Sequence, residues 1–105
     1  MWWVAAGLWA ALIFVVSSIP SAGSSGHVTL RGAIEHIAEY LVLAALLRRC
    51  GLSWRTSMGA ALLYGLTDEL HQAVVPGRDA SVADLVFDAV GATLGALLPV
   101  SRTRR

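Results

Sequence analysis

Four polar side chains that can exchange protons or bind a ligand lie within five residues of one another in an otherwise hydrophobic stretch, YGLTDELHQAVVPGR. These side chains are Asp68, Glu69, His71 and Gln72. On a helix, the first, third and fourth of them share one face, whereas Glu69 points about 100° away. Burying polar side chains costs free energy unless they bond to one another or to a ligand. Four of them in one hydrophobic stretch therefore predict a functional site.

Polar side chains also occur in an earlier hydrophobic segment of the chain. Glu35 with Glu39, and His36 with Tyr40, are pairs of residues four apart, so each pair shares a helix face. The pair of His36 and Tyr40 fits two interpretations equally well. One is a hydrogen-bonded contact that steadies the helix, and the other is a part in a site.

A later segment carries an acidic stripe that continues as a glycine stripe. Asp84, Asp88, Gly91 and Gly95 follow at steps of four and three, which places them along one helix face. The G-x-x-x-G spacing lets helices approach closely, and helix packing is the simplest role for the two glycines. Arg78 follows a Pro-Gly turn, where its guanidinium can bind a carboxylate or phosphate; a plain salt bridge to Asp84 is the alternative.

The residue types favour a binding pocket and assign no catalytic residue. No metal-binding motif such as H-E-x-x-H is present, so no cofactor is predicted, although the acidic side chains are chemically able to hold a divalent cation. No Ser or Cys stands beside a His in a nucleophile motif. Glu35 and His71 are further candidates beside the predicted lining, which consists of His36, Glu39, Tyr40, Tyr64, Asp68, Glu69, Gln72, Arg78, Ser81, Asp84 and Asp88.

The composition places this pocket in a membrane protein. Of the 105 residues, 56% are hydrophobic and only 14% are charged, and the mean hydropathy is +0.65. A chain this short forms one domain, residues 1–105, and a soluble fold of that size buries too little surface to hide so much apolar side chain. Cys50 is the only cysteine, so an intramolecular disulfide is excluded.

Four hydrophobic segments predict an all-α bundle of four transmembrane helices. A cleaved signal peptide is the alternative for the first segment, although it lacks a basic n-region. Ser81 and Asp84 form an S-x-x-D capping box at the start of the fourth. The segments run from Trp2 to Ile19, from about Ala33 to Leu47, from about Ser57 to Val75, and from after Ser81 to near Pro99.

The arginines predict the orientation of these helices. Six of the eight lie in the loop between the second and third segments or in the C-terminal tail, and the other two loops hold one each. This asymmetry places both termini in the cytoplasm, so all seven carboxylates belong to the extracytoplasmic half. The only basic cluster is of this topological kind, so the lipid bilayer is an expected partner and nucleic acid is not.

An ordered set of motifs resembles the VanZ-like family, small bacterial membrane proteins named for a teicoplanin-resistance protein. The likeness covers about residues 32–98 and implies a multi-pass protein of the bacterial cytoplasmic membrane. Members often carry Asp-Lys where Gly32 and Ala33 stand, and Asn where Asp88 stands. The motifs are H-x3-Y (His36, Tyr40), Y-x3-D-E-x2-Q (Tyr64, Asp68, Glu69, Gln72), P-G-R (76–78), S-x2-D (Ser81, Asp84) and G-x3-G (Gly91, Gly95).

Three functions agree with these patterns. The first is an outer pocket that recognises a lipid or cell-wall precursor head group and influences susceptibility to the glycopeptide teicoplanin, and the excess of acid favours a cationic or cation-bridged ligand. The second is a metal-dependent hydrolase or transferase acting on a membrane lipid. The third is a structural subunit of an envelope complex that uses Gly91 and Gly95 to bind a partner helix.

Overall fold

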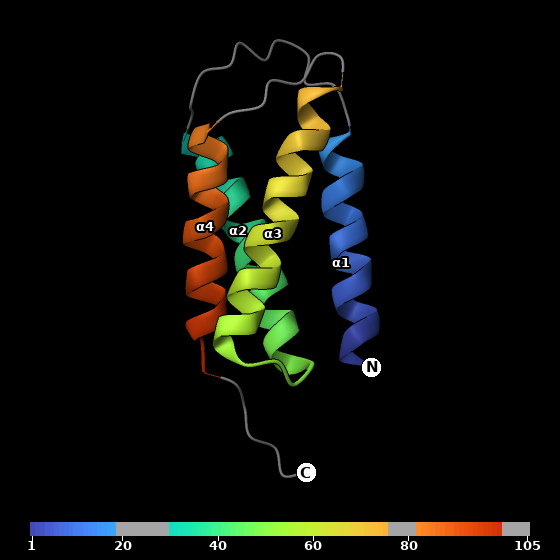
Figure 1. The fold of residues 1–105 in the computed structure, drawn as a ribbon, viewed down its shortest axis with the longest axis vertical. Coiled ribbons are helices and arrows are strands. Elements are labelled where there is room, and N and C mark those ends of the chain that lie inside the picture. Colours follow the sequence, from blue (N-terminus) through green and yellow to red (C-terminus); the bar gives the residue numbers. More distant parts are fainter. Residues whose placement is uncertain (19–29, 76–81, 100–105) are drawn as a thin grey trace.

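The computed structural model describes residues 1–18, 30–75 and 82–99, and these residues form four α-helices and no strand. The helices run alternately up and down the bundle, so α1 begins and α4 ends at the same end (Figure 1). The prediction of an all-α fold with four helices is confirmed. Their bounds are α1 Trp2–Ser17, α2 Leu30–Arg49, α3 Trp54–Ala73 and α4 Val82–Leu97.

Helix α2 begins three residues before the predicted start at Ala33 and continues through Arg48 and Arg49, beyond the predicted end at Leu47. The two arginines were expected to lie in the loop. Arginine is a good helix former, and a cation in the last turn interacts favourably with the helix dipole, so the helix extends through both residues.

Helix α3 also begins earlier than the predicted start at Ser57. The Ser53 hydroxyl accepts a hydrogen bond from the backbone N–H of Thr56 at 3.1 Å and caps the helix one residue before Trp54. Helix α1 ends at Ser17, shorter than predicted, and Ile19 lies outside the described residues.

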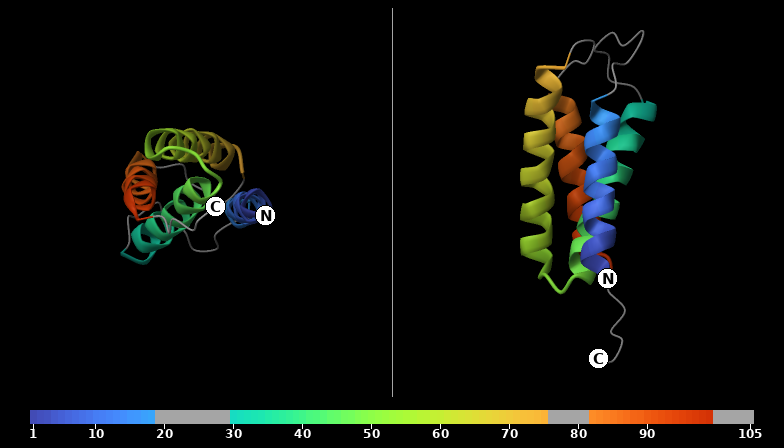
Figure 2. Two further views of the ribbon diagram at one scale, coloured as in Figure 1. Left: turned by 90° about the horizontal axis from the view of Figure 1, so that it is seen from below. Right: turned by 90° about the vertical axis from the view of Figure 1, so that its right-hand side faces the viewer.

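Helix α2 is the central helix of the bundle. It packs against α1, α3 and, most extensively, α4 (Figure 2). Helix α1 lies mainly against α2 and meets α3 only narrowly, and no contact joins the described residues of α1 to those of α4. None of the four described helices combines the length and the apolarity needed to cross a membrane on its own.

Two glycines bring α4 against α2. Gly91 and Gly95 are buried, and a Cβ atom on either would collide with a backbone carbonyl of α2, that of Ile37 or that of Leu41. The two backbones are therefore in direct contact, as the small-x-x-x-small spacing allows. Because α2 of the same chain fills this surface, the two glycines are not available to a partner helix.

The interior combines apolar side chains, among them four alanines, with polar side chains, and large apolar side chains also lie on the outside of every helix. The exposed ones include Leu8 of α1, Ile34 of α2, Leu70 of α3 and Val82 of α4. The buried apolar cluster consists of Ile13, Tyr40, Leu43, Ala44, Ala61, Ala92 and Ala96. The buried polar side chains among the described residues are Ser17, His36, Ser57, Asp68, Glu69, Gln72 and Asp88.

Candidate functional site

His36 of α2 lies between two carboxylates of α4. Its Nδ1 is 2.7 Å from Oδ1 of Asp88, and its Nε2 is 3.5 Å from Oδ2 of Asp84. The two aspartates are four residues apart, so both face α2 from the same side of α4. An imidazolium at this position donates toward a carboxylate from each ring nitrogen. The alternative of a hydrogen-bonded pair between His36 and Tyr40 is wrong, because His36 bonds to Asp88 instead.

The opposite wall of this cluster comes from one face of α3. Gly65, Asp68 and Gln72 are spaced at three and four residues and are all buried. A Cβ atom on Gly65 would lie 3.1 Å from Oδ2 of Asp88 and 3.3 Å from a ring carbon of Tyr40. The glycine therefore makes the space that Asp88 and Tyr40 occupy.

Several buried oxygens in this cluster lack a hydrogen-bond partner within the described part of the chain. They are Oη of Tyr40, Oδ1 of Asp68, Oε1 of Gln72 and Oδ2 of Asp88. Most buried polar groups in proteins are hydrogen-bonded, because an unsatisfied one retains its full desolvation cost. Four such oxygens close together indicate a site that receives donors from a ligand or from water.

A small cavity of about 50 Å³ opens beside the cluster. A water molecule takes about 30 Å³ in the liquid, so the cavity holds roughly one or two waters or a group of similar size. Its lining comes from three helices and consists of Val16 and Ser17 of α1, Glu35, His36 and Glu39 of α2, and Gln72 of α3.

Two hydrogen bonds between a side chain and a backbone carbonyl hold α1 beside this cavity. The indole N–H of Trp9 donates to the carbonyl of Glu39 at 2.8 Å, and the hydroxyl of Tyr64 donates to the carbonyl of Ala10 at 2.5 Å. Tyr64 was predicted to line the pocket. It is half-buried and binds α1 through its hydroxyl.

His71 lies against α1 rather than in the cluster. Its ring stacks on that of Phe14 with centroids 4.4 Å apart, and its Nε2 is 2.8 Å from the hydroxyl oxygen of Ser18. His71 therefore contacts α1 and not the cluster, although its spacing from Asp68 and Gln72 is that of one helix face. The i, i+3 neighbour lies near the edge of the buried face, where α1 covers it.

Nine of the eleven residues predicted to line the pocket lie in the described part of the chain, and Arg78 and Ser81 lie outside it. Glu69 is buried, although it was expected to point away from the stripe. The buried members are His36, Tyr40, Asp68, Glu69, Gln72 and Asp88, and the half-buried ones are Glu39, Tyr64 and Asp84.

Three residues of the site were not predicted, Val16, Ser17 and Gly65. Ser17 closes the first hydrophobic segment and carried no motif. Gly65 precedes Asp68 by three residues, and a glycine in line with buried polar residues was an available signal of close packing. The sequence analysis assigned a role in close helix packing only to the glycines of the fourth segment.

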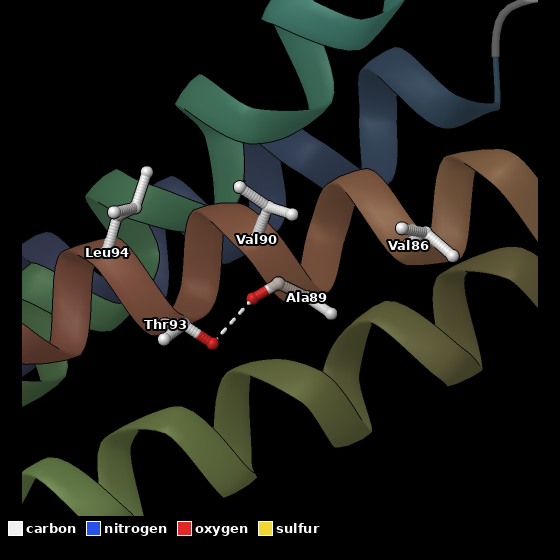
Figure 3. Close-up of a pocket in the computed structure, with 5 residues that line it drawn as sticks. All are labelled: Val86, Ala89, Val90, Thr93 and Leu94. Atoms are coloured by element: carbon white, nitrogen blue, oxygen red, sulfur yellow. Dashed lines mark hydrogen bonds between the residues drawn. The ribbon is translucent and has the colours of Figure 1, made fainter.

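An apolar groove without charged residues lies on the surface of α4, apart from the cluster. A groove of about 330 Å³ follows α4, lined by Val86, Ala89, Val90, Thr93 and Leu94 (Figure 3). The Thr93 hydroxyl donates to the carbonyl of Ala89 at 2.8 Å, so its hydrogen-bonding need is met within the helix. Among the described residues, no group of three or more His, Cys, Asp or Glu side chains is arranged to hold a metal ion.

By its fold and site, the chain is a small four-helix bundle with a buried cluster of one histidine and several carboxylates at one end. The chain belongs to the VanZ/LLP1 family, whose family model matches residues 2–102. The resemblance expected from the motifs is confirmed, and the match extends beyond residues 32–98 to include α1. Family membership supports a VanZ-like protein of the cell envelope. Comparisons with curated proteins and with solved structures found no match.

Proposed function

We propose that the bundle is embedded in the bacterial cytoplasmic membrane as a multi-pass protein. Large apolar side chains face outward on every helix, while polar and titratable side chains gather inside. Exposed apolar surface of this extent marks contact with a partner or a membrane, and ionisable residues within a membrane face the bundle interior. The family membership supports the same location.

The charges support one orientation of the bundle. Because the helices alternate in direction (Figure 1), the start of α2, the end of α3 and the start of α4 lie at one end of the bundle, and the end of α2 and the start of α3 lie at the other. The first end carries six carboxylates and is called the acidic end, and the second carries three arginines and is called the basic end. The acidic residues are Glu35, Glu39, Asp68, Glu69, Asp84 and Asp88, and the arginines are Arg48, Arg49 and Arg55. Arginines are enriched on the cytoplasmic side of membrane proteins, so the acidic end is extracytoplasmic and both termini are cytoplasmic. The acidic cluster then meets components of the cell envelope.

At the acidic end, the protein recognises the head group of a lipid or a cell-wall precursor, and this binding influences susceptibility to teicoplanin. The observation that carries this function is the set of buried oxygens of Asp68, Gln72 and Asp88 that have no hydrogen-bond donor within residues 1–18, 30–75 and 82–99. A cluster that served only folding would have its members satisfied by one another. A bound head group supplies the missing donors.

Asp68→Asn and Asp88→Asn test the function. Each replaces a carboxylate of the cluster with an amide of the same shape, so each is expected to shift the minimum inhibitory concentration of teicoplanin toward that of a deletion strain. Thr67→Val is the matched control on α3, because the Thr67 hydroxyl is exposed and, within the part of the chain that the structure describes, bonds only to the carbonyl of Tyr64 in its own helix. Membrane levels of each variant are compared by immunoblot.

The proposal is wrong if deletion changes the susceptibility while both aspartate variants, present at the wild-type level, behave as wild type. A teicoplanin response to Thr67→Val as large as that to Asp68→Asn would also contradict it, because the response would then not be specific to the cluster.

A further inference from the structure

The cavity beside the cluster presents hydrogen-bond acceptors. Gln72 is 1% exposed and lines the cavity, and its Oε1 has no partner within the described residues. The hydroxyl of Ser17 donates its hydrogen to the carbonyl of Phe14 at 3.0 Å, so toward the cavity it can only accept. The carboxylates of Glu35 and Glu39 are acceptors when ionised.

His36 is the one side chain in this lining that is able to carry a positive charge, and its ring nitrogens are directed elsewhere. One is 2.7 Å from Asp88 and the other 3.5 Å from Asp84, both on α4, which contributes nothing to the cavity lining. The histidine therefore offsets the charge of the α4 carboxylates. Of the cavity acceptors, Glu35 accepts from Nε of Arg31 at 3.2 Å, whereas Oε1 of Gln72 has no donor among the described residues.

We propose that this cavity binds a primary ammonium group. The inference rests on the proposed head-group recognition and names the chemistry of the group that enters. A primary ammonium has three N–H donors, no acceptor and one positive charge, which matches a wall of carboxylate, amide and hydroxyl oxygens. A phosphate is negatively charged, and the carboxylates of Glu35 and Glu39 in the same lining disfavour it by like-charge repulsion.

Size and lining also separate a primary ammonium from other cations. Quaternary ammonium groups are recognised by aromatic cages, and no aromatic ring apart from the imidazole of His36 lines the cavity. Calcium takes six to eight oxygen ligands and magnesium demands octahedral geometry, whereas the described residues offer no group arranged for a metal. The volume of about 50 Å³ admits the terminal –CH2–NH3⁺ of a larger molecule.

The selectivity of the wild-type protein tests the assignment. The full chain is placed in nanodiscs of phosphatidylglycerol, which has no amine, and the midpoint of thermal unfolding is followed by circular dichroism. Ethylammonium is expected to raise the midpoint saturably, because a ligand that binds only the folded state stabilises it. Tetramethylammonium and magnesium at the same ionic strength are expected to leave it unchanged, and an equal rise with either would overturn the proposal.

A second arm distinguishes a lipid source from a free or precursor-borne amine. Adding phosphatidylethanolamine to the nanodiscs is expected to compete with ethylammonium if the ammonium belongs to a membrane lipid. If it belongs to a non-lipid amine, the ethylammonium curve stays unchanged. Both results keep the ammonium assignment, which fails if ethylammonium has no effect in either lipid.

Two variants place the binding in this cavity. Glu39→Gln removes a charge and Gln72→Leu removes the unpartnered oxygen, and each is expected to weaken ethylammonium binding by about tenfold or more. Thr67→Val should bind as wild type does. Unchanged ethylammonium binding by both folded cavity variants would refute the assignment to this cavity. If either variant misfolds, the selectivity of the wild-type protein for ethylammonium still tests the proposal. Ammonium binding without any teicoplanin effect of Asp68→Asn would refute the proposed function alone.

Discussion

Helix α2 meets α4 and α1 through two different kinds of interface. Against α4, the backbones touch at Gly91 and Gly95, and His36 is bonded to Asp88. Against α1, contact depends on side chains, among them the indole of Trp9, which reaches a backbone carbonyl of α2. At the α2–α4 interface, an added Cβ atom would collide with the backbone. At the α2–α1 interface, we expect a side chain to move and so accommodate a substitution.

This difference separates the parts that the two interfaces play. The α2–α4 interface fixes the carboxylates of α4 beside His36 and defines the cluster. Helix α1 supplies Val16 and Ser17 to the cavity, and none of its described residues packs closely on those of α4. We therefore expect α1 to cover the cavity while the α2–α4 interface holds the cluster together. Four substitutions test this contrast, from the largest expected effect to the smallest.

Gly91→Leu is expected to have the largest effect. Its side chain would collide with the carbonyl of Ile37, and α2 and α4 would have to separate. Overpacking alone costs typically about 1–3 kcal/mol, and a backbone obstacle places this variant at or above that range. Gly7→Ala on α1 is the control, since a Cβ atom there meets nothing within 4 Å. Unfolding in a denaturant series should separate the two, and similar stability of both would contradict the contrast.

Asp88→Asn is expected to follow. The amide weakens the 2.7 Å contact with His36 inside the bundle, at a cost of about 1–3 kcal/mol in unfolding free energy. Asp84→Asn should cost less, because that carboxylate is half-exposed and its contact with His36 is 3.5 Å long. Chemical denaturation of both variants provides the comparison. A larger loss with Asp84→Asn would show that the outer carboxylate dominates.

Tyr64→Phe is expected to loosen α1 while leaving the α2–α4 pair intact. The loss of the hydrogen bond to the carbonyl of Ala10 costs about 1 kcal/mol. Hydrogen exchange followed by mass spectrometry should show faster exchange in α1 and unchanged exchange in α4. Equal acceleration in both helices would mean that α1 and the α2–α4 pair unfold as one unit.

Trp9→Phe is expected to have the smallest effect of the four. It keeps an aromatic side chain and removes the N–H donor to the carbonyl of Glu39, at a cost of about 0.5–1 kcal/mol. The same exchange experiment on α1 measures it. A loss that approached that of Gly91→Leu would refute the description of α1 as the tolerant interface.

The sequence was sufficient for the helices and for the polar stripes, because both depend on local spacing. Periodicity places Asp68 and Gln72 on one face of a helix, and it places Asp84 and Asp88 on one face of another. The partner of each face depends on the packing of the helices, which local spacing does not contain. For this reason, local spacing left the role of His36 open between a pair with Tyr40 and a part in a site, and the bond to Asp88, 52 residues away, appears only in the structure.

The hydrophobic periodicity also did not predict where the helices end or which residues at the edge of a helix face are buried. The start of α3 depends on one serine cap. The end of α2 includes two arginines that were predicted to lie in the loop between the second and third segments. Glu69 and His71 occupy the margins of the buried face of α3. Neighbouring helices decide which of two marginal residues is covered, so the buried glutamate and the histidine facing α1 appear only in the assembled bundle.

The long separation between His36 and Asp88 has a consequence for biosynthesis. The ribosome completes α1, α2 and α3 before it makes α4, so His36 is present while both of its carboxylate partners are still missing. The surface of α2 that receives Gly91 and Gly95 stays open for the same interval. The last helix to emerge therefore closes the bundle and supplies both carboxylate partners of His36 in one event, and a chain interrupted before α4 would present both defects to the proteases of quality control.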